Sequence, residues 1–186
     1  MGGTVGGAAV AAFEDFPAAV QDSCVDAGYR LDEIDHLLLG LVQVDAARPL
    51  HELGDQVGLS PSAVQRRLTR LRAAGVIRAQ VAVLEPRAVG AALTAVVLVA
   101  LVDDDAAHHE GFRARMRAEP AVQQCFNIVG QWDYVVVLVT ADLAANREVS
   151  RRLFVGDATH VQRFETLPAY ETVKSGLTVP LPEVAG

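Results

Sequence analysis

The sequence contains little cysteine, few aromatic residues and only one lysine, Lys174. Cys24 and Cys125 are far apart and lack the spacing of a metal site, so we expect two free thiols in a reducing compartment. The longest apolar run, Ala91–Val102, is too short to span a bilayer. The first residues lack the basic flank of a secretory signal and the myristoylation pattern. We therefore expect a cytoplasmic protein with no membrane partner, no metal and no cofactor.

The composition is that of a folded protein with an uneven charge distribution. Of the 186 residues, 51% are hydrophobic, which is ample for one domain or two small ones and excludes global disorder. The formal net charge is -7, so most of the surface would repel phosphate. Residues 31–80 nevertheless contain as many basic as acidic side chains. Binding to nucleic acid would therefore depend on a few well-placed contacts and on the salt concentration.

A basic stretch between Ser60 and Gln80 contains arginines and no acidic residue. It reads as a helix, because Ser60 is a good N-cap, Pro61 suits the first helical position and Gly75 can end the helix in the left-handed conformation. One apolar stripe is formed by Val64, Leu68 and Leu71. The arginines lie off this stripe: Arg66, Arg67, Arg70, Arg72 and Arg78. The pattern predicts a helix for the DNA major groove, and the alternative is an ordinary helix whose arginines are solvated.

Two further helices are predicted upstream of the basic one. Pro49–Val57 has an apolar face and is followed by Gly58, so together with the basic helix it makes a helix-turn-helix. An apolar stripe over residues 31–41 indicates a third helix, with Asp32 as its N-cap and Asp35 near its positive end. Three short helices can bury one small core.

The residue pattern changes after residue 91, where valine-rich segments typical of strands alternate with segments typical of helices. The expected elements run in the order β-α-β-β-α-β: Leu93–Val102, a helix over 106–118, Val122–Val129, Asp133–Thr140, a helix from Asp142 to Val155, and Val161–Lys174. This is the ferredoxin-like order, whose antiparallel sheet has helices on one face only. A second copy of the sheet is the simplest cover for the other face, so we expect a homodimer.

The fold class is thus α+β: an N-terminal winged-type helix-turn-helix and a C-terminal ferredoxin-like domain that dimerises through its sheet. Four segments are expected along the chain. They are an N-terminal extension over 1–30 that is mobile and has no assigned role, a helix-turn-helix domain over 31–78, a linker with a short strand over 79–91, and a ferredoxin-like effector-binding and oligomerisation domain over 92–186.

Motifs in both domains resemble the leucine-responsive regulatory protein/asparagine-response (Lrp/AsnC, or feast/famine) family over about residues 31–181. The matching residues are Leu31-Asp32-Glu33-Ile34-Asp35, Glu52-Leu53, Val57-Gly58-Leu59-Ser60, Arg66-Arg67-Leu68, Gly75-Val76-Ile77, Gly90, Gly130-Gln131-Trp132-Asp133-Tyr134, Thr166, Val173-Lys174 and Pro180-Leu181. The resemblance implies a bacterial or archaeal, nucleoid-associated transcription regulator. Such proteins bind double-stranded DNA, respond to small effectors that are usually amino acids, dimerise and often form octamers.

The resemblance also implies site residues. In the recognition helix it places Ser60 at the start, Ser62, Gln65 and Arg66 against base edges, and Arg67, Arg70 and Arg72 against phosphates. In the other domain, Gly130 and Asp133 match the effector motif. There, backbone N–H groups donate to the carboxylate of the ligand, and the Asp133 carboxylate accepts from its ammonium group. Trp132 can wall that pocket and Thr166 can line it. The alternative is a simple turn in which Asp133 satisfies its own backbone.

One departure from the family and two alternative functions remain. Pro168 falls inside an expected strand, so that strand must be an edge or carry a bulge. An effector-independent architectural DNA-binding protein would have the same helix-turn-helix. A small dimeric ferredoxin-like enzyme is the other alternative, but we expect no catalytic residues, because no nucleophile motif or phosphate loop is found and the adjacent His108 and His109 cannot both hold one metal.

Overall fold

The structure, a computed structural model, describes residues 30–181 of the chain. These residues form two compact units: a helical unit that ends at Val81 and also takes in 177–181, and a sheet unit from Ala82 to Gly176. Each unit has its own apolar core. The predicted N-terminal extension lies outside the described residues except for Arg30. None of the helices in 30–181 is long and apolar enough to cross a membrane.

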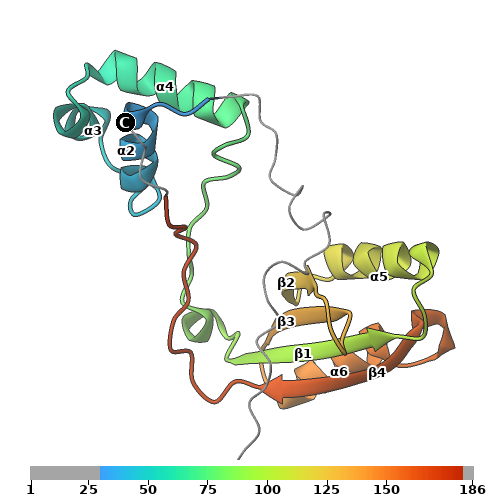
Figure 1. The fold of residues 1–186 in the computed structure, drawn as a ribbon. Helices are drawn as coiled ribbons and strands as arrows, with labels where there is room; N and C mark the ends of the chain where they lie inside the picture. The colour runs from blue at the N-terminus through green and yellow to red at the C-terminus, as the bar shows by residue number, and fades with distance from the viewer. Residues whose placement is uncertain (1–29, 182–186) are drawn as a thin grey trace, which may run out of the picture. The chain divides into compact units, whose positions relative to one another are not determined.

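The helical unit consists of the three predicted helices, α2 (Glu33–Val42), α3 (Leu50–Val57) and α4 (Pro61–Ala73) (Figure 1). Asp32 caps α2 in a capping box with Asp35, as the sequence predicted for the cap. The core is made by the apolar stripes of all three helices: Leu38, Leu39, Leu53, Val64, Leu68 and Leu71 are buried. Burial of one face of each helix therefore leaves the opposite face of α4 in solvent.

The turn between α3 and α4 depends on two glycines. Gly58 ends α3 in the left-handed conformation, with φ 70°, as expected from the sequence. Gly54 is required for a different reason, because a Cβ there would collide with the carbonyl oxygen of Leu59. The N–H of Leu59 donates to Gly54 O at 3.0 Å, so the chain doubles back tightly before Ser60 begins the next helix.

The end of the described chain packs on the helical unit, whereas the sequence analysis assigned it to the C-terminal domain. The side-chain amide of Gln43 pairs with the backbone of Val179, donating to its carbonyl oxygen at 3.1 Å and accepting from its N–H at 3.0 Å. Leu181 packs against the helical core. We call residues 177–181 the C-terminal strap, and it adds a non-local segment to a core that local helix patterns alone would not include.

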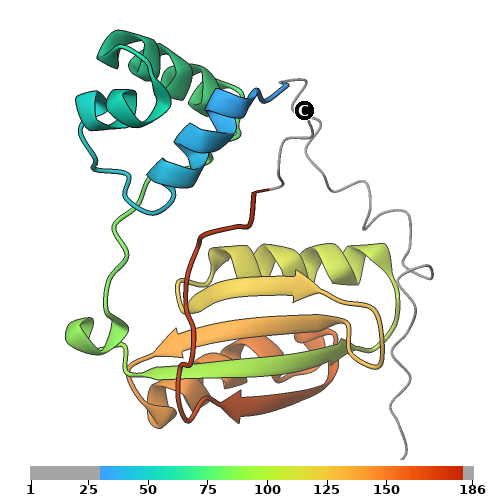
Figure 2. The ribbon, with the colours of Figure 1, turned by 60° about the vertical axis from the view of Figure 1, so that its left-hand side comes forward.

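The sheet unit has the predicted β-α-β-β-α-β order. Its elements are β1 (Leu93–Leu101), α5 (Ala106–Ala118), β2 (Val122–Asn127), β3 (Tyr134–Thr140), α6 (Leu143–Phe154) and β4 (Val161–Pro168), with short 3-10 helices η2 (Pro86–Val89) and η3 (Asp157–Thr159). The strands pair antiparallel in the order β2-β3-β1-β4, side by side in Figure 2. This is the ferredoxin-like topology.

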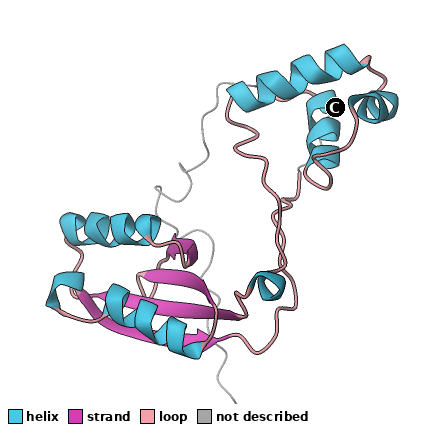
Figure 3. Cartoon of the chain, turned by 180° about the vertical axis from the view of Figure 1, so that it is seen from behind, coloured by secondary structure: helices cyan, strands magenta, loops and turns pink. Residues whose placement is uncertain are grey.

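Both helices of the sheet unit lie on one face of the sheet (Figure 3). They bury the alternate strand residues that face them, together with their own aromatic side chains. The core contains Val97, Val99, Leu101, Phe112, Met116, Tyr134, Val136, Leu138, Leu153 and Phe154. The opposite face has no cover from the described residues of this unit, and we call it the open face.

Three expectations about strands were wrong in part. No strand forms between 74 and 92, so the described helix-turn-helix has no β-wing and the linker has no strand. Val81, Val83 and Leu84 are exposed there with no strand to pair with, and Pro86 and Gly90 bound the helix η2 instead. β2 stops at Asn127 rather than Val129. β4 ends at Pro168 rather than Lys174, and it is an edge strand, which is one of the two arrangements that Pro168 allows.

Candidate functional site

The recognition helix α4 presents one polar face to solvent. Ser60 caps it, accepting from the N–H of Ala63 at 3.3 Å, and Ser62 lies 3.1 Å from Ser60 through their hydroxyl oxygens. Gln65 and Arg66 are exposed one turn further along. Sequence reasoning missed Thr69, which is exposed on the same face and accepts from Gln65 Nε2 at 3.5 Å. The four-residue spacing from Gln65 to Thr69 was the signal that could have revealed it.

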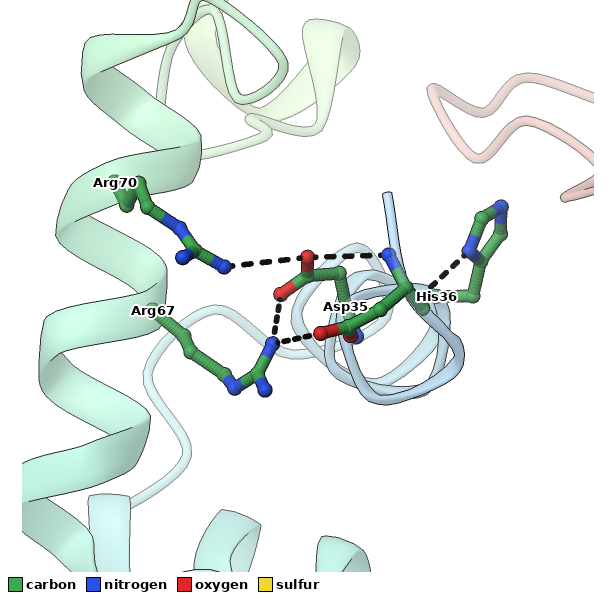
Figure 4. Close-up of polar contacts among 5 residues, drawn as sticks. Asp35, His36, Arg67 and Arg70 are labelled. Carbon is green, nitrogen blue, oxygen red and sulfur yellow. Dashed lines mark hydrogen bonds and ion pairs between the residues drawn. The ribbon is translucent and has the colours of Figure 1, made fainter. Parts of the chain in front are cut away.

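Arg67 does not project freely from α4. Its Nη1 donates to Asp32 Oδ2 at 2.6 Å and to Asp35 Oδ1 at 2.8 Å, and its side chain is only 22% exposed. Both aspartates belong to the start of α2, so Arg67 joins two helices (Figure 4). Two carboxylates therefore hold the guanidinium of Arg67 in the chain without DNA, and its contact with phosphate stays a prediction.

Asp35 is the centre of this cluster and is fully buried. Arg70 approaches its other oxygen, with Nη2 3.6 Å from Asp35 Oδ2, while keeping about half of its own side chain in solvent. The N–H of Asp35 also donates to Asp32 Oδ1 at 2.8 Å. We call Asp32, Asp35, Arg67 and Arg70 the α2–α4 ion cluster. It fixes the orientation of the recognition helix against α2.

The electrostatics of the cluster agree with its geometry. Burial alone would raise the pKa of Asp32, but hydrogen bonds from Arg67 and the Asp35 backbone, with the charges of Arg67 and Arg70, hold that pKa below its ordinary value. The hydrogen bonds to Asp32 and Asp35 raise the pKa of Arg67. Arg67 and Asp32 thus each stabilise the charged form of the other.

The arginines of α4 consequently divide into two kinds. Arg67 is committed to the cluster and Arg70 is shared between the cluster and solvent. Arg66 and Arg72 are exposed and form no ion pair within residues 30–181. The sequence grouped Arg67, Arg70 and Arg72 as phosphate contacts, and the partners supplied by α2 distinguish them.

The turn between β2 and β3 holds the predicted effector motif. Gly130 adopts φ 143°, and a Cβ built there would meet nothing within 4 Å. A substitution would therefore strain the backbone without a steric clash. Open space beside an accessible main chain is what a ligand approaching this turn would need.

Asp133 already has a structural partner. Its Oδ2 accepts from the N–H of Leu101 at 2.7 Å, and its own N–H donates to Val99 O at 2.9 Å. Asn127 Nδ2 donates to the carbonyl oxygen of Asp133 at 2.9 Å. Asp133 therefore connects the β2–β3 turn to the end of β1 through two hydrogen bonds. This structural role is similar to the alternative in which Asp133 only stabilises a turn.

Trp132 and Thr166 lie in different surroundings. The guanidinium of Arg163 lies 4.3 Å from the centre of the Trp132 ring, and Arg163 also donates to Gln131 O at 3.0 Å, so Trp132 stays beside the turn. Thr166 pairs with Val97 on β1 and lines a groove against α6. The structure thus brings Gly130, Trp132 and Asp133 together in one turn and places Thr166 with α6 instead.

The histidines of the sheet unit have ordinary partners. His108 bonds Asp103 through Nδ1 at 2.7 Å and stacks on His160, with ring centres 3.7 Å apart. His109 shares a hydrogen bond of 2.8 Å with the hydroxyl of Tyr134. No group of three or more metal-binding side chains occurs within the described part of the chain.

Comparison with known proteins places both units in one family. A model described as the AsnC-type helix-turn-helix domain matches residues 31–72, and one described as the Lrp/AsnC ligand binding domain matches residues 94–179. An uncharacterised helix-turn-helix transcriptional regulator of Sinorhizobium fredii, y4tD, is 34% identical over 87% of this chain and 95% of its own length.

Solved structures give the same result. The structure of an AsnC family regulator from Agrobacterium tumefaciens superimposes with a TM-score of 0.74 at 25% identity, covering 81% of this chain and 97% of the other. A transcriptional regulator from Neisseria meningitidis in complex with L-methionine gives a TM-score of 0.73 at 29% identity, covering 84% and 100%. With its helix-turn-helix and its ferredoxin-like sheet both matched, the chain belongs to the Lrp/AsnC family of transcriptional regulators.

Proposed function

We propose that this regulator binds operator DNA as a homodimer, with α4 in the major groove, and that an amino acid binding at the β2–β3 turn modulates it. The observation that carries the DNA-binding part is the exposed face of α4, where Ser62, Gln65 and Arg66 project while Arg67 is held by α2. The amino-acid part rests on Gly130 and Asp133 and on the likeness to a regulator solved with L-methionine. The protein then acts by binding rather than by catalysis, at the nucleoid.

The contacts to DNA divide by residue type. Gln65 suits a bidentate pair with adenine and Arg66 one with guanine, with Ser62 beside them near the start of the helix. Arg72 lies near the other end of α4 and suits a phosphate, which positions the protein without reading sequence. Arg70 contributes part of its charge to phosphate and part to Asp35.

Operator selection from a random DNA library, followed by binding assays on selected and random duplexes, tests this division. We expect Arg66→Ala to weaken binding to the selected operator by about 1–3 kcal/mol and to leave random DNA little changed. Arg72→Ala should weaken both equally and reduce the salt dependence. Arg87→Ala, an exposed arginine outside α4, is the matched control. Equal losses on both duplexes for Arg66→Ala would show that it contacts phosphate.

Dimerisation is proposed to occur through the open face. Phe126 on β2 is 53% exposed and Leu167 on β4 is 44% exposed, although both belong to paired strands. Between them lie the partly buried valines of β3, Val135, Val137 and Val139. A self-complementary contact over this surface would bring together two helix-turn-helix units for two half-sites. Further assembly to an octamer belongs to the same proposal.

Sedimentation velocity of Val137→Glu tests the dimer, because a charge at the centre of an apolar interface has no partner. The variant should sediment as a monomer and lose affinity for a two-half-site operator. Glu165→Gln, on the same face at the edge strand, serves as a control and should remain dimeric. A dimer that survives Val137→Glu would show that another surface is used.

Effector binding is best tested with Asp133→Asn. Asparagine keeps an oxygen that can accept from the N–H of Leu101, so the turn should persist while the negative charge is lost. In thermal unfolding, an amino acid at a hundredfold excess over its dissociation constant should stabilise the wild type by about 2.7 kcal/mol. The variant should lose that response. A wild type with no response to any amino acid would favour an effector-independent architectural protein.

A further inference from the structure

A groove of about 260 Å³ lies between α6 and the edge strand β4, away from the β2–β3 turn. The two elements contact each other on the helix-covered side of the sheet (Figures 1 and 3). Its walls are mainly apolar, and its polar groups come from α6 and one position of β4. The lining residues with apolar side chains are Leu143, Val155, Phe164 and Pro168.

Two polar groups lining the groove have no hydrogen-bond partner. Asn146 is 2% exposed and Ser150 is 6% exposed. Asn146 Nδ2 and Ser150 Oγ are both buried and unbonded. They are one helical turn apart on the same face of α6. Buried polar atoms almost always have a hydrogen-bond partner. Two buried atoms without one in the same groove therefore require an explanation, and a ligand that would supply the hydrogen bonds is one.

The charges around the groove select the kind of ligand. Arg147 lines it, is exposed and has no ion-pair partner within the described residues, while Arg151 lines it and is paired with Glu148. No carboxylate is among the lining residues. The groove therefore offers a cation and neutral donors to an anion, and it offers nothing that could neutralise an ammonium group.

We propose that the α6–β4 groove is a second small-molecule site, which binds a short branched carboxylic acid without an amino group, such as a 2-oxo acid. The carboxylate accepts from Asn146 Nδ2 and the Ser150 hydroxyl after a small rotation of these side chains and pairs with Arg147. The alkyl part lies against Phe164 and Val155, and the Thr166 hydroxyl is available for a 2-oxo group. This gives Thr166 a ligand-facing role away from the turn that holds Asp133.

The selectivity is opposite to that of the β2–β3 turn. There the proposed effector is an amino acid, with Asp133 available to its ammonium group. In the groove, the ammonium of the same amino acid would meet the charge of Arg147, and no lining carboxylate offsets that charge. One domain could thus respond to an amino acid and to its deaminated counterpart through separate residues.

The test uses the full chain and isovalerate as the probe, by isothermal titration calorimetry and by thermal unfolding. Isovaleramide has the same shape without the charge, and L-valine adds an ammonium group. We expect isovalerate to bind and to raise the unfolding midpoint, and isovaleramide to bind at least about tenfold more weakly, because a charge-assisted hydrogen bond is lost. L-Valine should not compete with isovalerate at this groove.

Two variants locate the binding. Asn146→Leu removes an unpaired donor and keeps the volume, so the free protein should be as stable as the wild type or more stable while isovalerate binding is lost. Arg147→Gln lies on the surface and should fold normally, with affinity reduced about tenfold or more. Arg87→Gln removes a charge elsewhere and should bind the probe normally.

Several results would overturn the proposal. They are no binding of isovalerate to the wild type, binding that persists in both Asn146→Leu and Arg147→Gln, or equal binding of isovaleramide. The amino-acid response at the turn is read separately through Asp133→Asn. Failure of the groove therefore leaves the proposed effector site untouched, and failure of the effector site leaves the groove untouched.

Discussion

The two units of this chain are stabilised in different ways. The helical unit has a small apolar core and a fully buried carboxylate, Asp35, held by arginines of the recognition helix. The sheet unit has a larger core with close aromatic pairs, such as Phe112 and Tyr134 at 4.4 Å between ring centres, and no charged side chain is buried among its described residues. Charge fixes geometry in the first unit, and apolar packing fixes it in the second.

This difference follows from what each unit must hold in place. Apolar packing along the single stripe of α4 selects which face of the helix is buried, but apolar contact is non-directional and so constrains the rotation of the helix less closely than a hydrogen bond does. Ion pairs to α2 accept one geometry only. A sheet needs no such device, because strand register and the alternation of side chains already determine which residues face the helices.

The largest expected effect is in the sheet core. Phe112→Ala removes a fully buried ring that contacts Tyr134 and leaves a cavity, so the sheet unit should lose about 3–5 kcal/mol of unfolding free energy. Fluorescence of Trp132, the only tryptophan, follows unfolding of this unit in urea. Tyr170→Ala, at a fully exposed aromatic residue, should change stability by less than about 0.5 kcal/mol.

The next effect tests the ion cluster. Arg67→Met leaves Asp35 buried with a weaker partner, and the helical unit should lose about 2–4 kcal/mol, measured by hydrogen exchange of α4 amides. Amides of β3 should exchange at unchanged rates. Arg66→Met, at the neighbouring exposed arginine, is the control. If the two variants are equally stable, the cluster does not hold α4.

A smaller loss is expected when the C-terminal strap is weakened. Leu181 packs on the helical core, so Leu181→Ala should destabilise the helical unit by about 1 kcal/mol. Leu177 lies in the same segment but is 69% exposed, and Leu177→Ala should have almost no effect. Hydrogen exchange of α2 amides separates the two, and equal protection in both variants would mean that the strap does not stabilise the unit.

The smallest effect concerns acid. Because the folded pKa of Asp32 lies below its ordinary value, its stabilisation is complete above the unfolded pKa, about 4, and is lost as the pH falls through the lower folded value. Asp32 is half-exposed, so the change is modest. In Asp32→Asn, stability of the helical unit should fall less steeply below pH 4. An unchanged acid limb, measured by urea unfolding across pH, would contradict this.

Local features were predictable and partners distant in sequence were not. The caps Ser60, Gly58 and Asp32 could be predicted because their hydrogen bonds reach only a few residues along the chain, a range over which sequence patterns are informative. The missing N–H of Pro168 required an edge strand or a bulge, and β4 is an edge strand. The β-α-β-β-α-β order followed from alternating apolar segments.

The features that the sequence did not reveal have one physical source. Arg67 and Asp32 are 35 residues apart, and nothing near Arg67 in the sequence indicates that its side chain pairs with a carboxylate. Thr166 faces α6 because of the register with β1, which depends on the pairing of whole strands. Val81 and Val83 have the alternation of a strand, but a strand also needs a neighbour, and none of residues 30–181 pairs with them.

The pairing of Arg67 with α2 has a consequence for the thermodynamics of DNA binding. Counterions leave DNA only when a cation that is not already neutralised replaces them. An arginine with two carboxylate partners brings no net charge to the phosphates, and Arg70 brings only part of its charge. The dependence of affinity on salt should therefore correspond to fewer released ions than the number of arginines in the basic stretch, leaving a larger share of the binding free energy to shape and base contacts.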